Sequence, residues 1–174
     1  MNDSFAIRKR EDLAKLKTLQ GRLPQGMLEI TAIKGDPPHE LSLRIRLATA
    51  RNASYPRERQ DVNYVTFQFP ERYPFQEPTV MFRTPIWNPN VYPSGKYCFG
   101  GWKVTENLEL FVIRLMKVIT LDPAIVNPRS AANAEAARWF LETIHHSPKL
   151  FPTALVEEVI RAAERPKIIW HNIK

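Results

Sequence analysis

The alternation of apolar and polar residues is clearest between positions 40 and 49. Polar residues separate apolar residues at every second position, namely Leu41, Leu43, Ile45 and Leu47. A period of two predicts a strand with one buried side and one solvent-facing side. Such strands are typical of antiparallel sheets, because strands of parallel sheets are usually buried on both faces.

Three shorter segments, at residues 27–33, 63–69 and 79–83, also have strand character. In the second of these, Val65, Phe67 and Phe69 share one face. The segment before the last strand, Pro70-Glu-Arg-Tyr-Pro-Phe-Gln-Glu-Pro78, holds three prolines in nine residues. Proline cannot donate to a sheet ladder, so this segment is expected to be a connection. The polar, basic residues 50–62 are expected to form a long loop.

Helical periodicity marks both ends of the chain. The sequence predicts helices at residues 5–20, 105–120, 130–143 and 153–165, followed by a tail at 167–174 that docks on the body. Thr105 is expected to cap the second helix, and Asp122-Pro123 to end it. This order predicts an α+β fold: an N-terminal helix, a four-stranded antiparallel meander, a central helix and two C-terminal helices.

Length and composition are those of an ordinary globular chain. Of the 174 residues, 44% are apolar and 25% charged, which suits a single domain over residues 1–174. No apolar run approaches the ~20 residues of a membrane span, and the N-terminus lacks the pattern of a secretory signal. A single cysteine cannot form an internal disulfide, so we expect a cytoplasmic protein with no membrane contact.

A net charge of +7 raises the question of nucleic-acid binding. The basic residues are spread along the chain, and no nucleic-acid motif is present, so we expect no nucleic-acid partner. One cysteine and four scattered histidines lack the spacing of metal ligands. Without a glycine-rich phosphate loop, the sequence predicts no cofactor, and any use of ATP would belong to a partner enzyme.

Chemistry is expected first in the irregular segment between the last strand and the central helix, at residues 88–102. It holds the only cysteine, Cys98, and three of the six glycines. Functional groups often lie on loops that a rigid scaffold positions. Taken alone, a single cysteine is more often an inert buried residue than a nucleophile. A cysteine protease is disfavoured because no histidine lies near Cys98 in the sequence.

Motifs at this segment and before it resemble the core of ubiquitin-conjugating enzymes. They are Tyr73-Pro-Phe-Gln-Glu-Pro78, Ile86-Trp-Asn-Pro-Asn-Val91 and Gly95-Lys-Tyr-Cys98. The family carries Tyr-Pro-Phe-x-x-Pro, His-Pro-Asn and Gly-x-x-Cys, with the same spacing between the asparagine and the cysteine. The resemblance covers residues 5–145, leaves 146–174 as a C-terminal helix and tail, and implies the family's fold.

The resemblance implies roles for the residues of the loop. Cys98 would accept the C-terminal glycine of a ubiquitin-like protein as a thioester and pass it to an amine. Sulfur suits this task because a thiolate is both a good nucleophile and a good leaving group. Asn90 would either support the loop or donate a hydrogen bond to the oxyanion, and both alternatives stay open. Support of the loop would fall to Asn88, Pro89, Trp102 and Asn127.

The resemblance also implies surfaces for partner proteins. Phe75 and Val104 lie in the two loops on which the family receives its ligases, although Phe75 could equally belong to the core. Arg8, Lys9 and Lys15 lie on the helix that docks the ATP-dependent activating enzyme, the alternative being an ordinary solvated face. Whether a ligase takes part stays open.

The sequence departs from the family pattern at several positions. Asn88 replaces the histidine, and only Phe-Gly-Gly separates Cys98 from Trp102. This short segment resembles standalone bacterial members of anti-phage defence operons. In those systems the carried protein is a ubiquitin-like protein or a nucleotidyltransferase with a C-terminal glycine. A non-enzymatic binding module on the same fold is the alternative function.

A further departure concerns the acceptor amine. Asn127 stands where many family members carry an acidic residue that orients the incoming lysine. A neutral amide cannot favour deprotonation of the lysine by its charge. Either another acid, such as Glu106 or Asp122, takes this role, or the acceptor is not an ordinary lysine.

Overall fold

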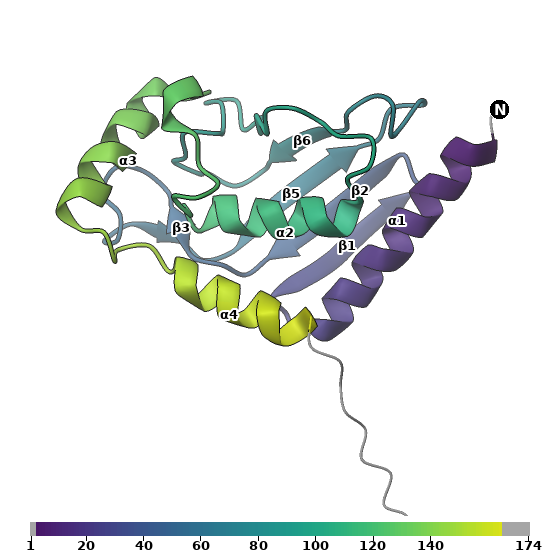
Figure 1. Ribbon diagram of the computed structural model, residues 1–174, viewed down its shortest axis with the longest axis horizontal. Helices are drawn as coiled ribbons and strands as arrows, with labels where there is room; N and C mark the ends of the chain where they lie inside the picture. The colour runs from purple at the N-terminus through teal and green to yellow at the C-terminus, as the bar shows by residue number, and fades with distance from the viewer. Residues whose placement is uncertain (1–2, 165–174) are drawn as a thin grey trace, which may run out of the picture.

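A computed structural model of the chain describes residues 3–164 and contains one larger sheet with helices packed along it (Figure 1). The sheet is antiparallel with the strand order β1-β2-β5-β6, and a two-stranded ribbon, β3-β4, is inserted between β2 and β5. The strands are β1 (Leu28–Lys34), β2 (Glu40–Ile45), β3 (Thr49–Ala50), β4 (Arg59–Gln60), β5 (Asn63–Gln68) and β6 (Thr79–Phe82). The helices are α1 (Asp3–Arg22), α2 (Leu108–Ile119), the 3-10 turn η1 (Pro128–Ser130), α3 (Ala134–His146) and α4 (Thr153–Glu164).

This order of elements confirms the predicted α+β fold, with its N-terminal helix, four-stranded antiparallel meander, central helix and two C-terminal helices. The alternation along β2 is also confirmed, because Leu41, Leu43 and Ile45 are at most 1% exposed. The predicted docking of the tail at residues 167–174 lies outside the described residues. No helix between residues 3 and 164 has both the length and the apolarity needed to cross a membrane.

The long strand predicted at 40–49 is shorter in the structure. Strand β2 ends at Ile45, which pairs with Leu28 of β1 on one side and with Asn63 of β5 on the other. The buried Asn63 side chain then donates to the Leu47 carbonyl at 2.8 Å, which turns the chain away from the sheet. The predicted loop at 50–62 is also wrong in part, because β4 pairs with β3 within it.

The helix boundaries differ from the predictions at polar residues. Asn107, and not Thr105, caps α2, since its side chain accepts a hydrogen bond from the Leu110 N–H at 2.9 Å. The helix ends at Ile119, before Asp122-Pro123 is reached. The helix predicted at 130–143 is replaced by η1 and α3, which begins only after its own cap, Asn133.

Helix α2 lies across the sheet and forms the middle of the core (Figure 1). Its apolar stripe is buried against the sheet, α1 and α4, and the members of that stripe are Leu108, Phe111, Val112, Leu115, Met116, Val118 and Ile119. Full burial of one such side chain contributes about 1.5–3 kcal/mol. The core therefore holds α2 rigidly next to the irregular segment that precedes it.

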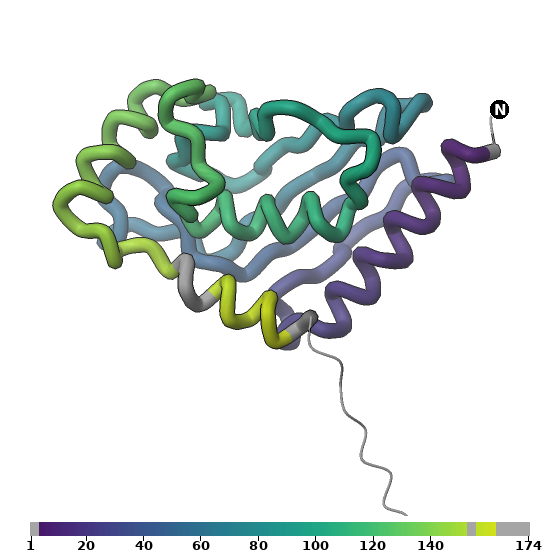
Figure 2. Tube along the Cα trace, viewed as in Figure 1, coloured from purple at the N-terminus to yellow at the C-terminus, as the bar shows by residue number. Residues whose placement is uncertain are grey.

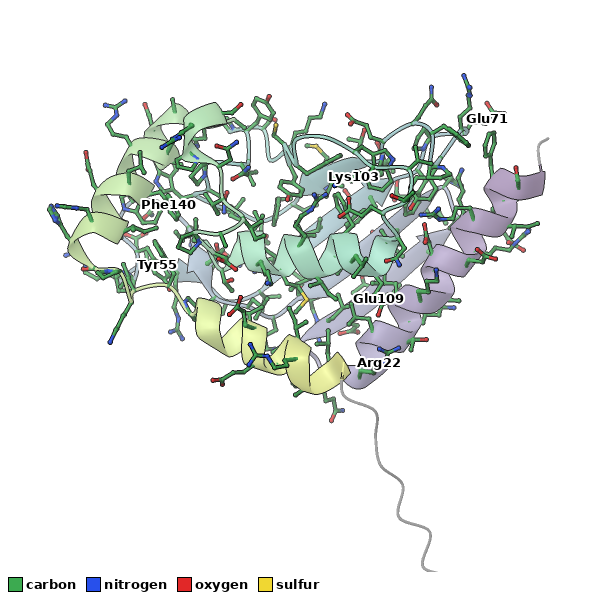
Figure 3. All side chains as sticks on the ribbon, in the orientation of Figure 1. Arg22, Tyr55, Glu71, Lys103, Glu109 and Phe140 are labelled. Carbon is green, nitrogen blue, oxygen red and sulfur yellow. The ribbon has the colours of Figure 1, made fainter. Side chains whose placement is uncertain are left out.

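A second apolar cluster lies under α3. Phe140 and Tyr55, which Figure 3 shows on the same side of the molecule, each stack on Phe151, with ring centroids 5.7 and 5.8 Å apart. Leu121 and Val126, which follow α2, also belong to this cluster. It anchors the chain between α2 and α3 on the main body.

Candidate active site

The segment that carries Cys98 lies against the edge strand of the sheet. Figure 2 shows the chain between β6 and α2 as an irregular path on the side of the molecule opposite α4. Within it, Lys96 pairs with Met81 in an antiparallel bridge, and the Tyr97 N–H donates to the Val80 carbonyl at 2.9 Å. Cys98 follows directly, partly exposed and with a free thiol. The sheet thus fixes the backbone on which the thiol is carried.

The turn at Gly95 requires glycine. Gly95 has φ +89°, and a Cβ atom there would lie 2.5 Å from the Phe82 carbonyl oxygen. Only glycine combines this backbone conformation with such a close approach. The family-like spacing of Gly95 and Cys98 therefore has a local cause, the tight return of the chain onto β6.

Asn88 has a structural role in the loop before the cysteine. It is fully buried, its Nδ2 donates to the Val118 carbonyl of α2 at 2.8 Å, and its Oδ1 accepts the Asn90 N–H at 2.8 Å. The neighbouring Pro89 carbonyl accepts the Ala132 N–H at 2.8 Å. The loop is tied on one side to the central helix and on the other to the start of α3.

Asn90 joins three parts of the site. Its backbone carbonyl accepts the Cys98 N–H at 2.8 Å, and its side-chain Oδ1 accepts the Asn127 N–H at 2.9 Å. Its Nδ2 lies 3.4 Å from the Cys98 carbonyl oxygen, a long hydrogen bond. This geometry agrees with a role of Asn90 in supporting the loop. It also leaves one donor on Nδ2 without a strong partner, next to the residue that carries the thiol.

The side chain of Asn127 forms hydrogen bonds with the backbone that follows it. Its Oδ1 accepts the N–H groups of Arg129 and Ser130 at 3.2 and 3.3 Å, which caps the η1 turn. Asn127 therefore contacts the site through its backbone bond to Asn90, while its side chain holds the next turn. Position 127 therefore supplies no acidic side chain to the site.

Trp102 closes the short segment after the cysteine. Its indole N–H donates to the Pro74 carbonyl at 2.6 Å, and its ring packs against Phe99, Tyr73 and Phe111 at centroid distances of 6.2, 5.8 and 5.6 Å. Between these aromatic anchors the chain is open at Gly100, where an added Cβ would meet no atom within 4 Å. The thiol thus lies between a fixed strand and an open glycine segment.

A groove of about 200 Å³ opens beside Cys98. Its walls come from the start of β6 and from the segment that pairs with it. The lining residues with polar or charged side chains are Glu77, Thr79, Tyr92, Lys96, Tyr97 and Cys98. Burial raises the pKa of Tyr97 well above its usual range, so this phenol stays protonated at neutral pH.

The two acids considered as substitutes for Asn127 are both engaged elsewhere. Glu106 forms an ion pair with Arg114 at 2.9 Å. Asp122 is 5% exposed and accepts the Ala124 N–H at 2.9 Å, so it shapes the turn after α2. Neither residue lines the groove. The acid that does line it is Glu77.

The residues predicted for partner surfaces have different environments. Phe75 is 64% exposed, so it does not belong to the core, and Val104 is 39% exposed. Lys15 is exposed on α1. The prediction that Lys9 lies on the same solvated face is wrong, because it is 8% exposed and its burial lowers its pKa. Arg8 is bound within the fold, as its guanidinium donates to the Glu106 carbonyl at 2.8 Å.

Sequence reasoning missed Glu77 and the buried pair of Asp12 and Tyr73. Glu77 occupies a variable position of the proline-rich motif, and only the pairing of β6 with the cysteine segment brings it to the groove. Tyr73 donates to Asp12, which is 1% exposed, at 2.5 Å. The sequence does hold a signal for Asp12, because an acidic residue on the apolar side of the first helix is expected to be buried with a partner. Among the described residues, no cluster of His, Cys, Asp and Glu could hold a metal ion.

Comparison with known proteins places the fold and the motifs in one family. A family model described as "Ubiquitin-conjugating enzyme" matches residues 42–151. The "Ubiquitin-conjugating enzyme E2-20 kDa" of Schizosaccharomyces pombe is 31% identical over an alignment of 87 residues, covering 47% of this chain and 47% of that protein. The "Ubiquitin-conjugating enzyme E2 13" of Arabidopsis thaliana is 30% identical over 96 residues, covering 45% of this chain and 55% of that protein.

The match with these relatives spans about half of their length. The solved structure titled "S. cerevisiae Ubc12" superposes with a TM-score of 0.59, at 20% identity, over 89% of this chain and 76% of the other. At that identity the likeness concerns the fold alone. Because the family model covers more than half of the sequence, the chain belongs to the ubiquitin-conjugating enzyme family.

Proposed function

We propose that this protein is a cysteine acyltransferase that carries a glycine-terminated protein on Cys98 as a thioester and passes it to an amine. The observation that carries this proposal is the setting of Cys98. It is the only cysteine, its thiol is free and partly exposed, and it lies on the rim of a groove in a chain of this family.

The first half-reaction is a thioester exchange. The Cys98 thiolate attacks the carbonyl carbon of an incoming glycyl thioester, the new C–S bond forms, and the old C–S bond breaks with its electron pair on the departing thiolate. The two thioesters are similar in energy, so the enzyme has to supply positioning more than driving force. The Cys98 N–H bond to Asn90 fixes the backbone of the nucleophile for this step.

The second half-reaction transfers the acyl group to an amine through a tetrahedral oxyanion. We propose that the Asn90 Nδ2, which has only the 3.4 Å contact to the Cys98 carbonyl, donates to that oxyanion. A donor that is fixed before the charge develops lowers the barrier without reorganisation. The hydrogen bond from the Asn127 N–H to the Asn90 Oδ1 holds the plane of the Asn90 side-chain amide in place.

The family and the short loop support a proposal for the carried protein. We propose a ubiquitin-like protein, activated by an ATP-dependent partner enzyme, as the general case. The short Phe-Gly-Gly connection to Trp102 supports a bacterial setting in anti-phage defence, in which a nucleotidyltransferase with a C-terminal glycine is the other candidate. One unpaired thiol supports a reducing, cytoplasmic location. The chain is proposed to act as one domain.

The test uses preformed thioesters, so that no activating enzyme has to be known. The chain is mixed with mercaptoethanesulfonate thioesters of ubiquitin, of a bacterial ubiquitin-like protein and of a C-terminal nucleotidyltransferase peptide. We expect an adduct with one of them that thiol reductant removes, seen by intact mass. Cys98→Ala should form none, and Cys98→Ser should form only a reductant-resistant ester. Absence of any adduct with all three would overturn the proposal in favour of a binding module.

A further inference from the structure

The groove beside Cys98 contains an acid that no other contact uses. Glu77 is exposed, and within residues 3–164 it takes part in no hydrogen bond or ion pair. Glu106, just before α2, is bound to Arg114, and Asp122, just after α2, is bound to the Ala124 N–H. Among these three carboxylates, only that of Glu77 faces the space through which an acceptor would reach the thioester.

The pairing of β6 with the cysteine segment sets the position of Glu77. Met81 lies opposite Lys96 in an antiparallel bridge. Continuing this register by two residues places Thr79 opposite Cys98, and Glu77 lies two residues before Thr79 along the same segment. Because side chains alternate between the faces of an extended chain, Glu77, Thr79, Lys96 and Cys98 share one face. All four line the groove.

The same register leaves room between the carboxylate and the thiol. Diagonal neighbours on paired strands are about 7–8 Å apart, within the reach of a long side chain. Gly100, which lines the same groove, has no side chain, and a Cβ added there would meet no atom within 4 Å. The space between Glu77 and Cys98 therefore suits a slender chain that ends in an amine.

We propose that Glu77 binds the incoming primary amine of the acceptor and accepts its proton, in the role for which Asn127 has no charge. This inference rests on the proposed function, and it names the acceptor class as an ordinary primary amine such as lysine. A carboxylate next to an ammonium group can hold it by charge and a hydrogen bond, and then take its proton as the nitrogen attacks. Lys96 in the same groove disfavours a second positive charge there.

The transfer step moves one acyl group and conserves protons and electrons. The ammonium of the acceptor gives one proton to the Glu77 carboxylate, and its lone pair forms a C–N bond to the glycyl carbonyl carbon. The C–S bond then breaks with its electron pair on the Cys98 sulfur, which leaves as thiolate. The second nitrogen proton passes to that sulfur or to solvent. Glu77 returns its proton to solvent, and the products are an amide and free Cys98.

The experiment measures discharge of a preformed Cys98 thioester, made from the same ubiquitin or peptide thioester that loads the chain. Free lysine and hydroxylamine are compared as nucleophiles, since the hydroxylamine nitrogen is unprotonated at neutral pH and needs no base. Glu77→Gln is expected to slow discharge to lysine at least about tenfold and to leave discharge to hydroxylamine unchanged. Glu71→Gln, an exposed acid of the same proline-rich segment outside the groove, is the matched control.

A pH profile separates a proton acceptor from a merely structural residue. In Glu77→Gln, the lysine rate below the amine pKa should rise tenfold per pH unit, as for an unassisted amine, while the parent rate rises less steeply. Glu77→Asp should recover part of the activity. If the parent forms the thioester but Glu77→Gln discharges it to lysine at the parent rate, the inference fails and the proposed function stands. If the parent forms no thioester, the proposed function itself fails.

Discussion

Asn88 illustrates how a residue can depart from a family motif without disturbing the site. A buried amide supplies one donor, to the Val118 carbonyl, and one acceptor, for the Asn90 N–H. These are the two bonds that orient the loop relative to α2. Since both polar groups of the side chain are satisfied at full burial, the substitution carries no penalty of an unpaired polar group.

Asn90 has two proposed roles, and one substitution separates them. Asn90→Asp keeps an oxygen that accepts the Asn127 N–H, but it removes the Nδ2 donor. We expect Asn90→Asp to retain most of the stability of the parent while discharging the thioester about 100-fold more slowly. Asn90→Ala should slow discharge to a similar extent. It should also lower the free energy of unfolding by about 1–3 kcal/mol, because it leaves the Asn127 N–H without a partner.

The measurements are urea unfolding and single-turnover discharge to lysine. Asn133→Asp is the control, because Asn133 is a helix cap whose Oδ1 accepts the Ala136 N–H, a role that a carboxylate fills equally well. Discharge by Asn90→Asp at the parent rate would contradict the oxyanion role and leave support of the loop alone.

At the scale of elements, a largely buried network joins α1 to the loop before α2 and to the proline-rich segment. Arg8 donates to Asp12 at 2.9 Å and to the Glu106 carbonyl at 2.8 Å, across the loop that precedes α2. Tyr73 of the proline-rich segment donates to the same carboxylate. Burial and the bond to Asp12 raise the pKa of Tyr73 well above its usual range, so it remains a donor. Asp12 and Arg8 of α1 together therefore link three separate segments.

Removing Arg8 should cost far more than removing its exposed neighbour on the same helix. Arg8→Ala leaves the Asp12 carboxylate buried without its cation, so we expect a loss of roughly 3 kcal/mol in the free energy of unfolding. Arg10 pairs with Asp36, and both side chains are at least 49% exposed, so Arg10→Ala should cost under about 1 kcal/mol. Urea unfolding compares the two.

A double substitution tests the mechanism of that loss. Adding Asp12→Asn to Arg8→Ala removes the unpaired charge and should restore part of the stability. Equal losses from Arg8→Ala and Arg10→Ala would contradict the buried network. The network would also be contradicted if adding Asp12→Asn restored none of the stability lost in Arg8→Ala.

Much of the arrangement of elements could be predicted from the sequence, because the patterns involved are local. The two-residue period at 40–45 and the stripe along α2 each report which side of an element is buried. Cys98 and its loop could be predicted because their spacing matches a known family. The sequence predicts the wrong cap for α2 because Thr105 and Asn107 are both good capping residues, and only the structure shows that Asn107 accepts the Leu110 N–H.

The remaining errors have the same cause, contacts between residues distant in the sequence. Lys9 was placed with the exposed cations of α1, but the packing of its helix against the body buries it. The location of Glu77 beside the groove depends on the pairing of β6 with Lys96, which no local pattern encodes. The environment of a residue cannot be predicted from local sequence when it depends on contacts with a distant segment.

At the scale of the whole molecule, the two apolar clusters raise the question of how many cooperative units the chain contains. The larger cluster joins the sheet to α1, α2 and α4, whereas the smaller one lies under α3. Leu121 of the smaller cluster follows Ile119 of the larger one after one residue. We infer that the clusters unfold together, as expected of a single domain of this size.

Phe140→Ala tests this inference because Phe140 lies in the smaller cluster. It is 2% exposed and stacks on Phe151, so its truncation should cost about 3–5 kcal/mol. Leu141→Ala is the matched control on the next residue, which is 54% exposed, and it should cost under about 0.5 kcal/mol. In urea, tryptophan fluorescence and far-ultraviolet circular dichroism should report one common transition that Phe140→Ala moves as a whole. Two separate transitions, with only one shifted, would show that α3 and its cluster form an independent unit.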